Sequence, residues 1–251
     1  MRPNLLILGG TTEATALAQA VAVQGIDATL SLAGRVERPK PQPIPTRIGG
    51  FGGVEGLVAY LAAQRVTHVV DATHPFAAQM SRNAVAACSA TGVPFVALTR
   101  PPWTPQPGDD WLHVPDIAGA VAALAGPPRR VMLAIGRMHL YAFAARPQHF
   151  YLLRLVDPPS APLHLPRHEA LVSRGPFTEA GDRALMRDHR IDLVVSKNAG
   201  GSGARAKIDA ARALGLAVLM IDRPALPARA EVATPAEVLD WLAHSGADLG
   251  V

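Results

Sequence analysis

The chain has few of the residues on which several classes of protein depend. Its 251 residues include a single cysteine, Cys88, which excludes an internal disulfide framework. We expect it to be a small core residue rather than a nucleophile. No apolar run approaches the roughly 20 residues needed to cross a bilayer, and no charged and apolar leader stands at the N-terminus. We therefore expect a soluble, cytoplasmic protein that does not contact a membrane.

The chain also lacks a basic stripe and a convincing set of metal ligands. Its net charge of +4 is modest and its basic residues are scattered, which argues against nucleic acid and leaves an anionic small molecule as partner. His164 and His168 have the spacing of ligands on a helix, but Pro166 breaks that helix and a third ligand is missing, so we expect no metal. The G-x-S-x-G elbow of serine hydrolases is absent at the strand-to-helix junctions.

Apolar residues are abundant, at 49% of the chain, which suffices for one large core or two modest ones. Apolar strands alternate with helical segments, a pattern typical of parallel sheets. The proline-rich stretch 100–108 is the best candidate for a boundary, because proline continues neither a central strand nor a helix. These features predict an α/β protein of two Rossmann-like domains with mainly parallel sheets. Residues 1–110 form the dinucleotide-binding domain and residues 111–251 the second, with a cleft between them.

The strand-turn-helix at residues 4–14 is the most informative motif. Its glycine pair lets the backbone turn sharply and approach a ligand, and the following helix offers free N–H groups to an anion. It is neither the three-glycine dinucleotide fingerprint nor a P-loop, and a plain turn that ends a buried strand is the alternative. We expect the cofactor's phosphates to lie on this turn, at Gly9, Gly10, Thr11, Thr12 and Glu13.

The second predicted strand, residues 28–35, has no carboxylate at its C-terminal end, where NAD-binding sheets place one for the ribose diol. Arg35, Arg38 and Lys40 cluster there instead. A cation at this place suits the 2′-phosphate of NADP. The alternative is a solvated basic loop. We expect Arg35 to be the lead residue for this phosphate.

Polar clusters follow three other predicted strands, at residues 71–77, 136–139 and 196–203. In an open α/β sheet the carboxyl edge forms the binding crevice, so we expect all three clusters to face one cleft. Structural roles are the alternative: Asp71 or Thr73 can cap a helix, His74 and His139 can be packed or solvated, and the glycine run can be a flexible turn.

Taken together, these motifs resemble the precorrin-6A reductase family of cobalamin biosynthesis. The matching segments occur in the family's order over nearly the whole chain, namely Leu8–Ala14, Asp71–Ala77, Arg100–Trp103, Arg174–Phe177 and Ser196–Gly201. The string Asp-Ala-Thr-His-Pro-Phe-Ala is the most specific of them. One departure is Ala199, where the family usually has a small polar residue, and it puts any role for that position in doubt.

The resemblance implies an NADPH-dependent reduction of one carbon–carbon double bond in a tetrapyrrole that carries many carboxylates. Cations at strand ends agree with such a substrate. We expect it to be bound by Arg100, Arg137, Arg174, Lys197, Asn198, Gly200, Gly201 and Lys207. Thr73 and His74 join the cofactor site. The proton donor stays open among Asp71, His74, His139, Lys197 and water. Handover of the macrocycle to neighbouring pathway enzymes is a further expectation.

Two rival functions remain. One is another NADP-dependent α/β reductase, although the Tyr-x-x-x-Lys pair of short nucleotide-sugar reductases is absent: none of Tyr60, Tyr141 and Tyr151 has Lys four residues on. The other is a non-catalytic sensor that binds NADP without turnover. An absorbance assay with precorrin-6A and NADPH separates the three.

Overall fold

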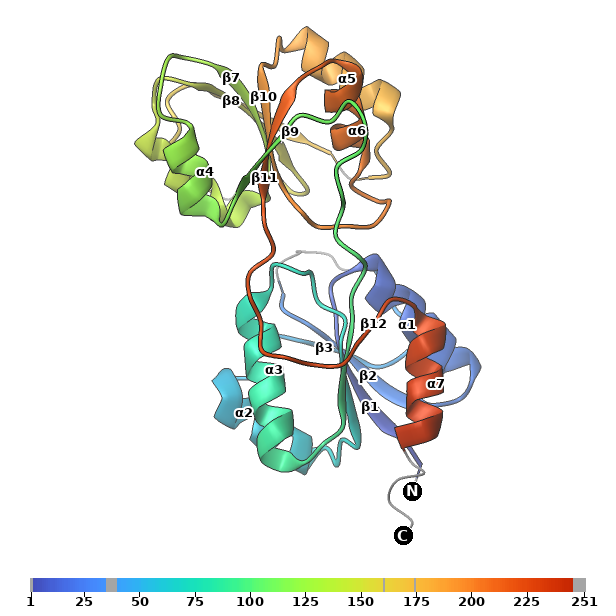
Figure 1. The fold of residues 1–251 in the computed structure, drawn as a ribbon. Helices are drawn as coiled ribbons and strands as arrows, with labels where there is room; N and C mark the ends of the chain where they lie inside the picture. The colour runs from blue at the N-terminus through green and yellow to red at the C-terminus, as the bar shows by residue number, and fades with distance from the viewer. Residues whose placement is uncertain (1, 35–39, 160, 174, 246–251) are drawn as a thin grey trace. The chain divides into compact units, whose positions relative to one another are not determined.

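The structure is a computed structural model that describes residues 2–34, 40–159, 161–173 and 175–245. The chain forms two compact units, each built around its own six-stranded sheet (Figure 1). One unit holds residues up to Pro101 and from Ala225 onward, and the other runs from Pro102 to Pro224. Every strand pair in the described part of the chain is parallel. The predicted α/β class with parallel sheets is confirmed.

The first sheet has the strand order β12-β5-β4-β1-β2-β3. This is the Rossmann order, with the sixth strand supplied by the C-terminal segment. The strands are β1 (Asn4–Leu8), β2 (Asp27–Leu32), β3 (Thr46–Ile48), β4 (His68–Asp71), β5 (Phe95–Leu98) and β12 (Glu231–Val232). The helices of this unit are α1 (Thr12–Val23), α2 (Gly53–Ala63), α3 (Ala78–Thr91) and α7 (Pro235–Ser245).

Strand β1 is buried on both faces, which explains its continuous apolar run. Leu5 and Ile7 pack in one core cluster with residues of α1 and α7, whereas Leu6 and Leu8 pack in another with residues of α2 and α3. The two helix pairs cover opposite faces of the sheet (Figure 1). The period-two alternation of side chains along a strand therefore supplies both layers of the core.

The second sheet repeats the same plan with the order β6-β11-β10-β7-β8-β9. Its strands are β6 (Trp111–Val114), β7 (Arg130–Ala134), β8 (Phe150–Leu155), β9 (His168–Val172), β10 (Leu193–Lys197) and β11 (Ala217–Ile221). Its helices are α4 (Ile117–Ala123), the 3₁₀ segment η1 (Arg137–Ala145), α5 (Glu179–Asp188) and α6 (Ala206–Ala213). One core cluster joins Met132, Val194 and Val218 of the sheet to Met186 of α5 and Ile208 of α6.

The boundary between the two units differs from the predicted one. The sequence predicted a single division after residue 110, whereas the chain passes from the first unit to the second after Pro101 and returns to the first after Pro224. Strand β12 pairs with β5 of the first sheet, Glu231 opposite Ala97 and Val232 opposite Leu98. The helix α7 that follows buries Val238 in the same core. The C-terminal segment thus belongs to the first unit because it completes that unit's sheet and covers one face.

Local contacts define where helices α7 and α3 begin, and Cys88 of α3 is a core residue. A capping box begins α7, since Thr234 Oγ1 accepts from the Glu237 N–H at 3.2 Å, and Glu237 Oε2 accepts from the N–H groups of Thr234 at 3.3 Å and Ala233 at 2.6 Å. Cys88 is buried as expected, and burial raises the pKa of its thiol to about 12, with a further contribution from Asp71. Helix α3 begins at Ala78 and not at Pro75, because Pro75 lies in a turn in which the Ala77 N–H donates to the His74 carbonyl at 2.7 Å.

Candidate functional site

The turn after β1 has a backbone that only glycine adopts easily. Gly10 has φ +120°, and a Cβ there would meet no atom within 4 Å, so its exposed face is open to a ligand. Gly9 is small for a different reason: a Cβ would lie 2.5 Å from Leu30 Cδ1. Helix α1 begins at Thr12, whose N–H has no acceptor within the helix, whereas the N–H groups of Glu13 and Ala14 are bonded to the Glu13 carboxylate and to Thr11 Oγ1. The turn therefore presents backbone donors to an anion.

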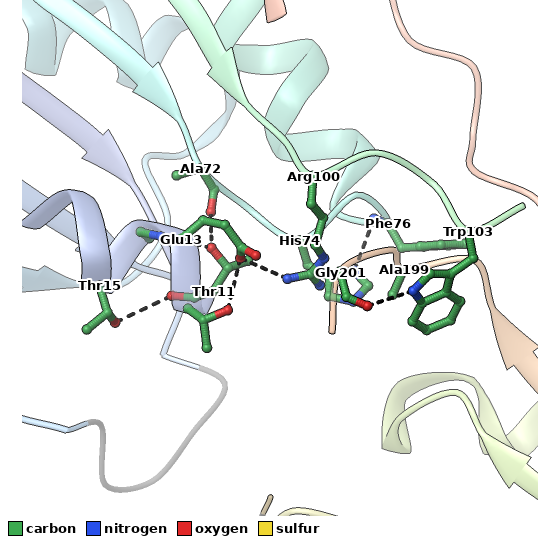
Figure 2. Close-up of polar contacts among 12 residues, drawn as sticks. Thr11, Glu13, Thr15, Ala72, His74, Phe76, Arg100, Trp103, Ala199 and Gly201 are labelled. Atoms are coloured by element: carbon green, nitrogen blue, oxygen red, sulfur yellow. Dashed lines mark hydrogen bonds and ion pairs between the residues drawn. The ribbon is translucent and has the colours of Figure 1, made fainter. Parts of the chain in front are cut away.

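Thr11 caps α1 and ties the turn to the next strand. Its Oγ1 accepts from the Ala14 N–H at 3.1 Å and donates to the Ala72 carbonyl at 2.7 Å (Figure 2). Ala72 follows β4, which lies beside β1. The glycine turn and the loop after β4 are thus joined where the strand order reverses, the place at which open α/β sheets bind their ligands.

Glu13 lies in the first turn of α1 and forms an ion pair with Arg100 at 2.8 Å, both side chains being mostly buried (Figure 2). Burial of the carboxyl group raises its pKa, but the bond from its own backbone N–H and the Arg100 guanidinium outweigh burial and lower the pKa below its usual value. The Glu13 charge is therefore compensated and does not oppose an anion at the helix N-terminus. Arg100, expected to bind substrate, is paired with the helix that follows the glycine turn.

Asp71, the last residue of β4, is buried, and both of its carboxylate oxygens are engaged. Oδ1 accepts from the Thr73 N–H at 3.1 Å and from Thr73 Oγ1 at 2.6 Å. Oδ2 accepts from Ser81 Oγ at 2.5 Å and from Arg229 Nη1 at 3.1 Å. With all these donors in place, Asp71 organises the loop. This arrangement does not favour it as a proton donor.

His74 is half-buried in the same loop. Its Nδ1 accepts from the Phe76 N–H at 3.2 Å, and the two rings lie 5.8 Å apart (Figure 2). An Nδ1 that accepts cannot carry a proton, so this geometry places the N–H of neutral His74 on Nε2. His74 is thus fixed within the loop that Thr11 joins to the glycine turn.

The carboxyl end of β2 is fixed by a residue outside the predicted basic cluster. Arg35 and Arg38 lie outside the described residues. That residue is Arg47 on β3, which no sequence pattern indicated; its Nη1 donates to Ser31 Oγ at 2.7 Å and to the Gly49 carbonyl at 2.9 Å. Its guanidinium also lies 3.9 Å from the Phe51 ring centroid. Arg47 therefore fixes the end of β2 and the loop after β3 to each other.

In the second unit, Asn198 and Trp103 organise the loop after β10. Asn198 Oδ1 accepts from the Trp103 N–H at 2.8 Å, and its Nδ2 donates to the Trp103 carbonyl at 3.0 Å. Trp103 Nε1 donates to the Gly201 carbonyl at 2.7 Å (Figure 2). Gly200 and Gly201 have φ +71° and +69°, left-handed values that suit glycine. The glycine run is therefore a shaped loop with specific contacts.

The other expected substrate residues are placed unevenly. Lys197 is half-buried at the end of β10, and Ala199 is buried beyond it. Lys207 is only 5% exposed, with Nζ 2.5 Å from the Ala204 carbonyl and 4.9 Å from the Trp103 ring centroid. Arg137 is exposed at the start of η1, with half-buried His139 two residues on. Arg174 lies outside the described residues.

Two residues that the sequence did not single out, Arg47 and Arg229, bond to groups of the candidate site. Trp103 ends the matching segment Arg100–Trp103, and its burial, at 6% exposure, agrees with its size. Nothing local marks Arg229, since its partner Asp71 stands 158 positions away.

The described residues form no group of three metal-ligating side chains, and none of their helices is both long and apolar enough to span a membrane. By contrast, the first unit fits a dinucleotide. Gly10 leaves the space that a Cβ would fill, α1 begins directly after the turn, and the charge of Glu13 is paired with that of Arg100. No carboxylate stands at the end of β2 to bind a ribose diol, since Ser31, Leu32, Ala33 and Gly34 occupy it.

Comparison with known proteins gives a consistent picture. The family model for precorrin-6x reductase CbiJ/CobK matches residues 4–243. The precorrin-6A reductase of Rhodobacter capsulatus is 62% identical over 244 residues, which cover 97% of both chains. That of Mycobacterium tuberculosis is 45% identical over 225 residues, 90% of this chain and 91% of the relative. The solved structure of a CobK precorrin-6A reductase is 61% identical with a TM-score of 0.93, covering 97% of this chain and 98% of the other.

Proposed function

The chain belongs to the precorrin-6x reductase family, and from that premise we propose that it reduces one carbon–carbon double bond of precorrin-6A to give precorrin-6B, with NADPH as the hydride donor. NADPH, when bound, supplies the hydride, and a proton completes the addition of two hydrogens to the macrocycle. The protein's own part is to bind both molecules, orient them and exclude water.

The observation that carries the cofactor assignment is the turn at Gly10. Its left-handed backbone, the open space where a Cβ would stand and the N-terminus of α1 together suit a pyrophosphate. The Thr11 hydroxyl donates to the Ala72 carbonyl and accepts from the Ala14 N–H, so it holds this turn against the loop after β4. Gly9, Gly10 and Thr12 thus form the phosphate site, with Thr11 and Glu13 supporting it.

NADPH rather than NADH follows from the end of β2, which lacks a carboxylate. Arg35 comes directly after this end and is the proposed partner of the 2′-phosphate. Arg47 has a supporting role, since its guanidinium is bonded to Ser31 and to the carbonyls of Gly49 and Gly50.

The loop after β4 orients the cofactor and does not supply the proton for the substrate. His74 is held by the Phe76 N–H on its Nδ1, and Thr73 is held beside it by Asp71, so the loop can orient the cofactor. Because its Nδ1 lone pair accepts from the Phe76 N–H, we assign His74 a positioning role rather than that of proton donor. His139 and Lys197 are the chain's remaining candidates for that step, alongside water.

The macrocycle's carboxylates are bound by cations at strand ends, with Lys197, Arg137 and Arg174 as the proposed contacts and Arg100 near the cofactor. Buried Lys207 and Asn198 shape the loop after β10 instead, because both are bonded to backbone groups. Direct handover of product to the next enzyme stays a prediction.

The test is to mix the purified protein with precorrin-6A and NADPH, and to follow NADPH absorbance and product mass. One NADPH consumed per macrocycle, and a product heavier by two hydrogens, is the expected result. NADPH binding without oxidation would favour a sensor. Oxidation with another substrate, and none with precorrin-6A, would favour a different reductase.

A further inference from the structure

The buried carboxylate of Asp71 joins three separate stretches of the first unit. Thr73 contributes its backbone N–H and hydroxyl from the loop after β4, Ser81 contributes its hydroxyl from α3, and Arg229 contributes Nη1 from the segment that leads into β12. Asp71 is 3% exposed, so water cannot replace a missing partner easily. The carboxylate is therefore the point at which these three stretches hold one another.

The guanidinium of Arg229 is the positive charge that pairs with this carboxylate. Its side chain is 8% exposed, and it also bonds through Nε to Glu231 Oε1 at 3.0 Å. A buried carboxylate is tolerated when a cation and hydrogen-bond donors surround it, and becomes costly once the cation is removed. Loss of Arg229 thus leaves Asp71 with hydroxyl and amide donors alone.

The consequence reaches His74 through the shared carboxylate. Thr73 Oγ1 and N–H bond the Oδ1 oxygen of the same group, and His74 follows directly, with its Nδ1 fixed by the Phe76 N–H. Thr11 Oγ1 holds the Ala72 carbonyl one residue before Thr73. If the Asp71 carboxylate changed position, Thr73 would move with it, although Ala72 is held by Thr11 and His74 by Phe76.

We propose that Arg229 is a positioning residue for the nucleotide site: through Asp71 it holds the Thr73–His74 backbone in the conformation that receives the cofactor. The inference rests on the proposed function for the identity of the cofactor. Arg229 itself contacts no reacting atom in this scheme. It differs from Arg82, whose Nη2 bonds the Ala225 carbonyl at 2.9 Å and anchors the same C-terminal segment without touching Asp71.

The test compares Arg229→Gln and Arg229→Lys with the matched control Arg82→Gln. NADPH affinity is measured by titration, and amide exchange at Thr73 and Phe76 is measured in the protein without cofactor. We expect Arg229→Gln to weaken NADPH binding about tenfold or more and to speed exchange at both amides, since it loses a charge-assisted bond. Arg229→Lys keeps the charge but not the planar fork, so its values should fall between those of the parent and Arg229→Gln. Arg82→Gln should match the parent.

Parent-like affinity and exchange in folded Arg229→Gln would overturn the proposal, as would equal losses in Arg82→Gln. If Arg229→Gln does not fold, Arg229→Lys decides, and parent-like values in that variant would overturn it. A parent protein that fails to bind NADPH would instead overturn the proposed function. The exchange measurement would still show whether Arg229 holds the loop.

Discussion

The side-chain amide of Asn198 pairs with both backbone groups of Trp103, accepting from its N–H at 2.8 Å and donating to its carbonyl at 3.0 Å. The pairing imitates one rung of a β-ladder where no strand is present. It fixes the loop after β10 to the segment by which the chain enters the second unit.

Asn198→Ala should therefore lower the free energy of unfolding by about 2–3 kcal/mol, because two buried backbone groups lose their partner. Chemical denaturation measures this loss. Asn83→Ala on α3 is the control and should stay within about 0.5 kcal/mol of the parent. An Asn198→Ala protein with unchanged stability but a raised substrate KM would mean that the amide binds substrate instead.

Gly10→Val should abolish tight NADPH binding while the fold persists. The side chain would occupy the open space at the turn, and φ +120° would be strained for valine. Gly25→Val is a matched control, since Gly25 also has positive φ, at +65°, with no atom within 4 Å of a Cβ, but it follows the opposite end of α1. Calorimetric titration should show lost affinity for Gly10→Val alone. Equal affinity in the two variants would remove the phosphates from this turn.

Lys197→Ala should raise the substrate KM or lower kcat about tenfold, the scale of one charge-assisted contact. Steady-state kinetics with precorrin-6A measure both constants. Arg187→Ala, at an exposed position on α5, should leave them unchanged. Values within about twofold of the parent for Lys197→Ala would indicate a solvated lysine.

Arg35→Ala should reduce kcat/KM for NADPH by about tenfold or more and barely affect NADH, which has no 2′-phosphate. Arg47→Ala provides the comparison. It should weaken both cofactors alike, because Arg47 holds the backbone after β3 through Gly49 and Gly50. A parent enzyme that used NADH equally well would contradict the assignment to Arg35.

The stabilisation that Glu13 provides at neutral pH should be lost in acid. Its pKa is lowered in the folded state by its own backbone N–H and by Arg100, in spite of burial. A lowered folded pKa gives stability that is present above the unfolded pKa and is lost as pH falls through the folded value. Denaturation curves from neutral pH to acid should thus show a smaller loss for Glu13→Gln than for the parent. Parallel curves would show that the ion pair with Arg100 adds nothing.

The sequence predicted the elements whose signal is local. Strands such as β1 and β10 are runs of buried apolar residues, and the capping box at Thr234 marks α7 by itself. It did not predict β3, β6 or β12. These are short edge strands beside proline-rich or polar segments, and β12 is only two residues long. Edge strands carry little pattern of their own, because their partner strand determines them.

The candidate site also has a part that the sequence predicted and a part that it did not. Residue types at strand ends pointed to Gly10 and to the loop after β4, since topology brings carboxyl ends of parallel strands to one edge. What Asp71 does there depends on Arg229, which is far away in sequence, and on a Ser81 hydroxyl within a helix. Partners of this kind are decided by packing, and the pattern of residues around each gives no sign of them.

Because β12 completes the first sheet, the unit that is synthesised first is completed last. The ribosome produces β1 to β5 first, yet the sheet that they form lacks its outer strand and the helix α7 until the C-terminal residues emerge. The second unit, begun later, has all its strands once β11 has been made. A chain that stopped after Pro224 would therefore damage the older half of the molecule, leaving the edge of β5 bare and Asp71 without its arginine.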